Sequence, residues 1–378
     1  MEERKLASIQ KCLSIEPIEG ADRIQLARVL GWQCVVRKGE FNVGDLGVFF
    51  EIDSVLPKTP VFEFMKDRKY RVRTIKLKGT LSQGLFLPIS SFGFKKAEEG
   101  DNVTLSLGVE KYERPEDKVP HMAFNRKRKW YGFLYRIPFI RDLILNRGKG
   151  AVEFPTHLVP KTDEIRLQTL GEEFLKQYKD VPISVTRKMD GQSGTFVWYK
   201  NKFTVASRNL WYQYPKDNNY WKVAKKTELE KVLKEVAKGK NIAIQGEICG
   251  PGIQGNKYKF TELELFIYGI YDIDNQRYFT PYELHEFVTT KLIYREAKVF
   301  LIPNLIKYDS GYTVGDIGTT VKEWLEYATR KSHIVPEVWD EGIVVRSIDN
   351  KPYNVRNMNS KRFSFKVVSN EFLLEYGE

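Results

Sequence analysis

Four residues, Lys188 to Gly191, read KMDG and directly follow the segment VPISVTR, which is typical of a buried strand. A protonated lysine is a poor nucleophile, so a reactive one needs a nearby cation or metal to lower its pKa and a rigid element to hold it. Such a lysine could attack the α-phosphate of a nucleotide and form a phosphoramide. Asp190 could orient the lysine and hold metal-bound water, and Gly191 would let a nucleotide approach the backbone closely. Alone, the tetrapeptide is weak support, because surface turns contain it by chance.

Further along the chain, predicted strands carry single polar residues where a core strand would have apolar ones. Carboxylates suit a metal, cations suit phosphate groups and an aromatic ring suits a base, so these strands together indicate a nucleotide pocket. The polar residues are Arg208, Asn209, Glu247, Tyr268, Asp340, Glu341 and Lys366, and Gly342 follows Glu341.

The elements that would position these residues form an α/β pattern from about residue 166 to the end. Strands such as NIAIQGEI and EGIVVRS alternate with helical segments. In residues 227–239, Thr227 and Glu230 suit a capping box, and Gly239 is expected to end the helix. Its apolar face is predicted to comprise Leu229, Val232, Leu233 and Val236.

Residues 1–110 read as short strands separated by Gly-rich turns, which predicts a small β-sandwich or barrel. In the segment RKYRVRTIKLKG, Arg71 and Arg73 would share one strand face and Lys76 and Lys78 the other. A β-bulge near Thr74 would bring all four basic residues together. A small barrel with a basic face can follow a phosphate backbone, as an OB-fold does.

Residues 111–165 resemble a linker with an insertion. Residues 126–149 interleave basic and aromatic residues. They could grip single-stranded nucleic acid, form a short amphipathic helix or act as a nuclear address. A linker that simply docks on the enzyme is at least as plausible.

The composition narrows the class of protein. The 378 residues carry a formal net charge of +12, which favours a polyanionic partner such as nucleic acid. An apolar run of membrane-spanning length is absent, and so is a secretory leader. Three scattered cysteines and four histidines predict neither a disulfide framework nor a zinc site. We therefore expect an intracellular monomer, cytoplasmic or, in a eukaryotic or viral setting, nuclear.

The ordered segments of the second half resemble the covalent nucleotidyltransferase superfamily of ligases and capping enzymes; they read KMDG, SRN, GEICGPG, IYGIYD, DEGIVV and FKVV. The GE-x-x-GPG form resembles RNA ligases in particular. Residues 6–57 resemble the OB-like domain that precedes the ligase core in one RNA ligase family, and residues 154–170 resemble its approach to that core. The resemblance spans nearly the whole chain except residues 121–150.

This resemblance implies an α+β protein of three parts. An OB-like β-barrel domain at residues 1–110 would bind nucleic acid. A linker at residues 111–165 would lead to an adenylyltransferase domain at residues 166–378, an ATP-grasp-like ligase core of antiparallel sheets with flanking helices.

The resemblance also implies a role for each polar residue. Lys188 would carry AMP, and Lys366 would bind the α-phosphate. Arg208 and Asn209 would contact ribose and phosphate, and Tyr268 would stack on adenine. Glu247 would bind the ribose or a metal-bound water, and Asp190 and Glu341 would hold hydrated Mg²⁺ or Mn²⁺.

Each of these roles competes with a purely structural one. Tyr268 could be a core aromatic, with Phe266 or Tyr271 stacking on the base in its place. Arg208 and Asn209 could belong to an ion pair in a turn. Glu341 could cap a strand, and Lys366 could occupy a solvated edge position.

Two positions depart from the family pattern. Many RNA ligases have a glutamate before the reactive lysine, where this chain has Arg187. We therefore expect backbone groups around Thr186, together with Arg187, to recognise the base. The last segment often has two lysines spaced by one residue. In this chain Ser364 stands at the earlier position, and Lys361 or Arg362 is expected to take over part of the role of the missing lysine.

Three functions remain open on the sequence. The first is an ATP-dependent RNA ligase that joins 3′-OH and 5′-phosphate ends, with nicks in an RNA or RNA/DNA duplex as the expected substrate. The second is an mRNA-capping guanylyltransferase, which would use GTP. The third is a non-catalytic nucleic-acid-binding protein with a degenerate core, which the intact set of polar residues argues against. The β-rich domain precedes the core and the chain ends soon after Lys366, an order that favours the ligase.

Overall fold

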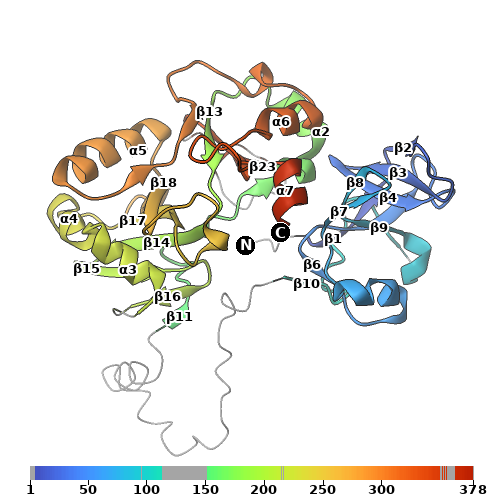
Figure 1. Ribbon diagram of the computed structural model, residues 1–378, viewed down its shortest axis with the longest axis horizontal. Coiled ribbons are helices and arrows are strands. Elements are labelled where there is room, and N and C mark those ends of the chain that lie inside the picture. The colour runs from blue at the N-terminus through green and yellow to red at the C-terminus, as the bar shows by residue number, and fades with distance from the viewer. Residues whose placement is uncertain are drawn as a thin grey trace, which may run out of the picture.

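The computed structural model describes residues 5–94, 96–112, 151–213, 215, 217–349, 351, 353, 355 and 362–377. The basic and aromatic segment of residues 126–149 and the residue Lys361 lie outside the described residues. A β-rich N-terminal unit stands beside a larger unit of sheets and helices (Figure 1), so the α+β organisation expected from the sequence is confirmed.

The N-terminal unit consists of short antiparallel ladders around one apolar core. Their strand orders are β1-β5-β9, β2-β3-β4, β7-β8 and β6-β10. Alternation explains the packing, since Trp32 and Cys34 on β4 are buried while Gln33 between them is only half-buried. The strands are β1 Ala7–Lys11, β2 Ser14–Pro17, β3 Ile24–Val29, β4 Trp32–Arg37, β5 Leu46–Phe50, β6 Ser54–Val55, β7 Thr74–Leu77, β8 Thr80–Gln83, β9 Leu85–Pro88 and β10 Glu110–Lys111, with short helices at Pro60–Arg68 and Ile89–Phe92.

The β-bulge expected near Thr74 is not formed. Strand β7 begins at Thr74 and pairs with β8 in regular register. Arg71 precedes the strand and is buried, with its guanidinium 2.6 Å from Asp53 and stacked over the ring of Tyr112. The prediction that Arg71 joins a basic binding face is therefore wrong. A buried arginine needs a carboxylate partner, and Asp53 supplies one.

The larger unit contains two sheets. One has the order β11-β16-β15-β14-β17-β18-β19, with β20 beside β18, and the other has the order β12-β23-β22-β13-β21. Their strands are β11 Ala151–Glu153, β12 Ile165–Arg166, β13 Ile183–Lys188, β14 Gln192–Tyr199, β15 Lys202–Ala206, β16 Leu210–Tyr212, β17 Ile242–Cys249, β18 Glu264–Asp272, β19 Arg277–Tyr278, β20 Phe300–Leu301, β21 Asn304–Ile306, β22 Gly342–Ser347 and β23 Ser364–Val368.

Each sheet has a helix-covered apolar face. Helices α3 and α4 pack on the eight-stranded sheet, and α2 and α6 pack on the five-stranded one. The helices are α2 Leu167–Gln177, α3 Asn219–Lys226, α4 Leu229–Val236, α5 Pro281–Phe287, α6 Val321–Ala328 and α7 Asn370–Tyr376, with short helical turns at Gln254–Asn256, Val288–Leu292, Ile293–Arg295 and Val314–Asp316. No helix in the described part of the chain has both the length and the apolar composition to cross a bilayer.

The apolar face predicted for α4 is confirmed, but its capping box is wrong. Leu229, Val232 and Leu233 are buried. Thr227 instead ends helix α3, where its hydroxyl donates to the carbonyl of Val223, and Glu228 at the start of α4 makes no side-chain cap. The chain breaks into two helices at this point, so the hydroxyl of Thr227 serves the last turn of α3 and does not cap the first amides of α4.

The two units touch at defined points. The amide of Gly31 donates to the carbonyl of Gln168 at 2.8 Å, and Thr169 donates to Glu51 at 2.8 Å. A Cβ at Gly31 would lie 2.8 Å from Val321 and 2.9 Å from Gln168, so glycine is required for this close approach. Gln83 of β8 also donates to Asn370 of α7 at 2.9 Å.

Candidate active site

Strand register places the polar side chains of the five-stranded sheet on one face. Thr186 of β13 lies opposite Val344 of β22, which lies opposite Lys366 of β23. Cross-strand partners share a face and alternate residues along a strand share it too, so Lys188 joins Thr186 and Lys366 there. The opposite face is apolar and packs on α2 and α6. Two lysines that are far apart in sequence therefore stand on one polar face.

Lys188 pairs with a carboxylate. Its Nζ lies 2.6 Å from Glu341, which directly precedes β22. Burial alone would lower the pKa of Lys188, but the carboxylates of Glu341 and Glu247 outweigh burial and raise it above its ordinary value. The expectation that a cation lowers the lysine pKa is therefore not met by the side chains of the protein itself.

Glu247 is the second carboxylate beside Lys188. It lies on β17 of the eight-stranded sheet, opposite Ser193 on β14. Burial raises the pKa of Glu247 to about 8, and the charges of Glu341 and Asp190 add to the rise while Lys188 opposes it. Glu247 therefore binds a proton more tightly than an ordinary glutamate, because it is buried beside two other carboxylates.

Among the described residues, Asp190 forms its ion pair with Lys257 and not with Lys188, although its charge adds to the rise in the pKa of Lys188. Its carboxylate pairs with Lys257, and its amide donates to the hydroxyl of Tyr258 at 2.9 Å. Gly191 packs against β17, where a Cβ would lie 2.6 Å from the carbonyl of Ile248. The small residue is thus required for strand packing, in addition to any approach of a ligand.

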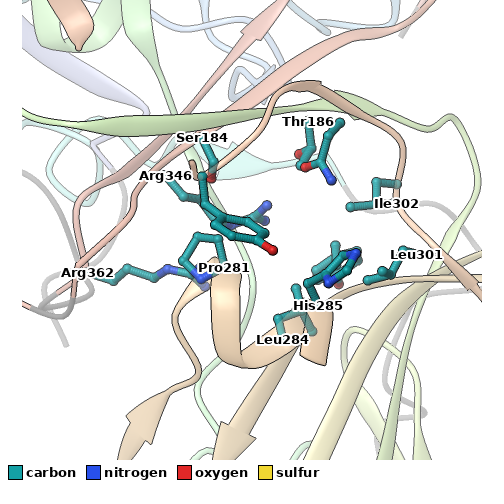
Figure 2. Close-up of a pocket in the computed structure, with 12 residues that line it drawn as sticks. Ser184, Thr186, Pro281, Leu284, His285, Leu301, Ile302, Arg346 and Arg362 are labelled. Carbon is teal, nitrogen blue, oxygen red and sulfur yellow. The ribbon is translucent and has the colours of Figure 1, made fainter. Parts of the chain in front are cut away.

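A pocket lies beside the polar face (Figure 2). Ser184 and Thr186 on β13 face Pro281, Leu284 and His285 of α5 across it. Further lining residues are Tyr268, Leu301, Ile302, Asn304, Tyr308, Arg346 and Arg362.

Tyr268 is the one residue of the three candidate aromatics that lines this pocket. Its hydroxyl bonds with Ser193 at 2.9 Å and with Thr162 at 3.1 Å. Phe266 packs instead with Met189, and Tyr271 packs in a separate apolar cluster.

Arg208 and Asn209 turn toward a segment that the sequence motifs did not assign to the site. Arg208 lies 2.6 Å from Asp163, and Asn209 accepts a hydrogen bond from Lys161 at 3.2 Å. Lys111 of β10 lies 3.6 Å from the same Asp163. Partial burial acts in the opposite direction, but Arg208, Lys111 and Lys366 hold the pKa of Asp163 well below its usual range. Several cations therefore surround one carboxylate.

Arg187 points away from the polar face. It forms an ion pair with Asp340, which is 1% exposed, and its amide donates to the carbonyl of Pro303. Ser364 donates to the carbonyl of Val345, and Arg362 stacks over Tyr278 at 4.9 Å while lining the pocket. Burial beside Arg346 lowers the pKa of Arg362 to about 10. Arg362, two residues before Ser364, therefore lines the same pocket as Tyr268.

Sequence reasoning missed Lys111, Asp163 and Lys257. Asp163 stands within residues 154–170, which the resemblance covered without giving Asp163 a role, and Lys257 follows the GEICGPG segment in GNKY, so their charge and position offered a signal. Lys111 offered none, because its strand pairs with distant β6.

The described residues contain no group of three His, Cys, Asp or Glu side chains that could bind a metal directly. Burial and the charge of Glu341 nevertheless raise the pKa of both Asp190 and Glu247. A hydrated divalent cation would relieve this repulsion, so the donor set fits a cation held through water.

The chain is similar to known proteins over both of its units. A family profile described as RNA ligase matches residues 181–368, and an OB-fold domain profile matches residues 6–89. No curated protein sequence gives a significant match.

Several solved structures of Naegleria gruberi RNA ligase are similar to the whole chain. A variant without ligand, a variant with AMP and manganese, and the enzyme with pyrophosphate each share 32% identity, a TM-score of 0.77 and 98% coverage of both chains. The OB-fold and ligase-core architecture expected from the sequence is confirmed. The identity and the coverage together show that the chain belongs to the RNA ligase family.

Proposed function

We propose that this RNA ligase uses ATP and a divalent metal to join 3′-OH and 5′-phosphate ends, with Lys188 as the residue that carries AMP. The observation that carries the proposal is the position of Lys188, at the end of a polar strand face shared with Lys366 and in contact with Glu341. Similar solved ligases contain ATP and manganese, which supports the choice of nucleotide and metal.

The first step would form a bond between Lys188 Nζ and the α-phosphorus of ATP and break the bond to the β-phosphate oxygen, so that pyrophosphate leaves. Lys188 must first lose a proton, which Glu341 and Glu247 oppose while they are unneutralised. A divalent cation would supply charge that offsets these carboxylates and the growing charge on the phosphate. Lys366, on the same face, is placed to stabilise that phosphate charge.

In the second step a 5′-phosphate oxygen of the RNA would attack the AMP phosphorus, and the bond to Lys188 would break. The 3′-OH would then attack the activated 5′-phosphate, form the phosphodiester and release AMP. Lys188 is restored, so one ATP is consumed for each bond formed.

The pocket favours adenine over guanine. Guanine presents two donor groups, N1–H and N2–H₂, which a carboxylate accepts best, whereas adenine presents only the N6 amine. None of the described residues that line the pocket is acidic. Thr186, Asn304 and the ring of Tyr268 supply a hydroxyl, an amide and a stacking surface.

We propose nicked duplexes as the substrate and a monomer as the active form. The hairpin β7–β8 exposes Arg73, Lys76 and Lys78, and β7 lies next to α7, which follows Lys366 along the chain. A duplex on this hairpin would reach the polar face and be held through its phosphates.

Two experiments test the function. Incubation with α-labelled ATP or GTP should give an AMP label alone, and Glu341→Ala should take up little label at ordinary magnesium concentration. In a panel of nicked duplexes with RNA or DNA on each side of the nick, duplexes made wholly of RNA should be among those sealed. A GMP label, or labelling without any sealing, would contradict the proposal.

A further inference from the structure

Lys257 lies between Asp190 and the C-terminal helix. Its Nζ pairs with the carboxylate of Asp190 and donates to the carbonyl of Gln254 at 2.9 Å. The side chains of Lys257 and Asp190 are only 19% and 11% exposed, so water screens the pair weakly. The ion pair is therefore a well-defined contact inside the site.

Two aromatic rings of α7 enclose the lysine. Its Nζ lies 5.4 Å from the ring centre of Phe372 and 5.1 Å from that of Tyr376. Both distances suit a cation–π contact. The Gln254 carbonyl and the Asp190 carboxylate therefore bind Nζ beside these two rings. The rings therefore restrict the rotamers from which Lys257 can act.

Asp190 is held at two points by consecutive residues. Lys257 binds its carboxylate, and the hydroxyl of Tyr258 accepts from its amide at 2.9 Å. Asp190 is two residues from Lys188, on the turn that connects β13 and β14. The orientation of the Asp190 side chain therefore depends on Lys257 and Tyr258 and not on Lys188.

The same helix also touches the N-terminal unit. Asn370 at the start of α7 accepts from Gln83 of β8 at 2.9 Å. Figure 1 shows α7 between the N-terminal unit and the sheets of the core. A continuous series of contacts thus leads from the β7–β8 hairpin through α7 and Lys257 to Asp190.

We propose that Lys257 is a positioning residue for the adenylylation of Lys188, which fixes the carboxylate of Asp190 and links it through α7 to the N-terminal unit. The inference rests on the proposed function. Asp190 is one of the carboxylates proposed to hold the hydrated cation, and residues that orient such metal-binding groups typically contribute about 10- to 100-fold to metal affinity or activity. Because Lys257 is not among the described residues that line the pocket, its loss should slow the reaction more than it weakens ATP binding.

The test is single-turnover adenylylation at varied ATP concentration with Lys257→Met, Lys257→Arg and the wild type. Lys257→Met should lower the maximal rate by about 10- to 100-fold with the ATP concentration for half-maximal rate changed by less than about 3-fold. Lys257→Arg should recover much of the rate, because it keeps a cation between the rings and the carboxylate. Lys259→Met, an exposed lysine in the same loop, is the matched control and should behave as the wild type.

A folded Lys257→Met that adenylylates at the wild-type rate would overturn the inference. So would a Lys257→Arg that is no faster than Lys257→Met, because packing alone would then explain the loss. If Lys257→Met does not fold by circular dichroism, Lys257→Gln, which keeps a donor for the Gln254 carbonyl, is judged by the same criteria. Failure of the wild type to take up AMP would instead refute the proposed function.

Discussion

The Nζ of Lys188 lies 2.6 Å from the carboxylate of Glu341, and the two residues stand at adjoining ends of neighbouring antiparallel strands. Lys188 ends β13, and Glu341 directly precedes β22. Their contact follows from strand register, because Lys188 pairs with Gly342, the residue after Glu341. A Cβ at Gly342 would lie 2.1 Å from the carbonyl of Val367, so glycine is needed to let β22 and β23 meet here. Without ligands, the pair keeps the lysine protonated.

The raised pKa of Glu247 predicts how stability changes with pH. A carboxyl group whose pKa is about 8 in the folded state and ordinary in the unfolded state binds a proton more tightly when folded. Its contribution is fully present at low pH and is lost as pH rises from about 4.5 to about 8. The loss is at most roughly 1.4 kcal/mol per pH unit. In metal-free buffer, Glu247→Gln should therefore gain stability relative to the wild type across this window in denaturant titrations. A constant difference would show that Glu247 is already ionised in the folded protein.

The cations around Asp163 predict an effect on phosphate binding. Asp163 holds Arg208 at 2.6 Å and places a negative charge near Lys366. Asp163→Asn should strengthen binding of inorganic pyrophosphate by roughly 3- to 30-fold in calorimetry, because a competing charge is removed. The affinity for adenosine should not change. Asp217→Asn, an exposed aspartate paired with Lys222, is the control. Weaker pyrophosphate binding would mean that Asp163 holds Arg208 in place for the ligand.

The Arg187–Asp340 pair is predicted to stabilise the fold and not to bind the base. Asp340 is 1% exposed, so removing Arg187 leaves a buried carboxylate with only the hydroxyl of Ser332 and the charge of Arg330 beside it. Arg187→Ala should lower the free energy of unfolding by about 3–5 kcal/mol, and adding Asp340→Asn should restore part of it. The ATP concentration that gives half-maximal adenylylation should change little in the folded variants. A large loss of ATP affinity with an unchanged free energy of unfolding would instead show that Arg187 binds the nucleotide, as expected from the sequence.

The basic hairpin predicts a separation of RNA binding from adenylylation. Changing Arg73, Lys76 and Lys78 to alanine should weaken binding of nicked duplex and reduce the slope of log affinity against log salt by about 0.9 for each lost phosphate contact. Labelling with AMP should be unchanged. Arg71 is left intact, because its substitution would disturb the core. The matched control replaces three exposed lysines on and after α4: Lys234, Lys238 and Lys240. Equal effects of both triple variants would show non-specific charge attraction.

The site was predictable where strand alternation fixes a side chain. Lys188, Glu247 and Glu341 meet because each stands at or beside a buried strand whose face is set by its apolar neighbours. The same reasoning failed for Arg71 and Thr227, where a local pattern was overridden by a distant partner, Asp53, and by a break between two helices. Asp163 and Lys257 were missed because their importance depends on residues brought together by the fold, which spacing in one sequence does not reveal.

The most direct test of the account is to locate AMP on the protein. The wild type is incubated with ATP and magnesium, and the labelled peptide is identified by mass spectrometry after proteolysis. The account predicts AMP on Lys188 alone, no label in Lys188→Ala, and continued sealing of pre-adenylylated ends by that variant. AMP on another residue, or wild-type labelling of Lys188→Ala, would contradict it.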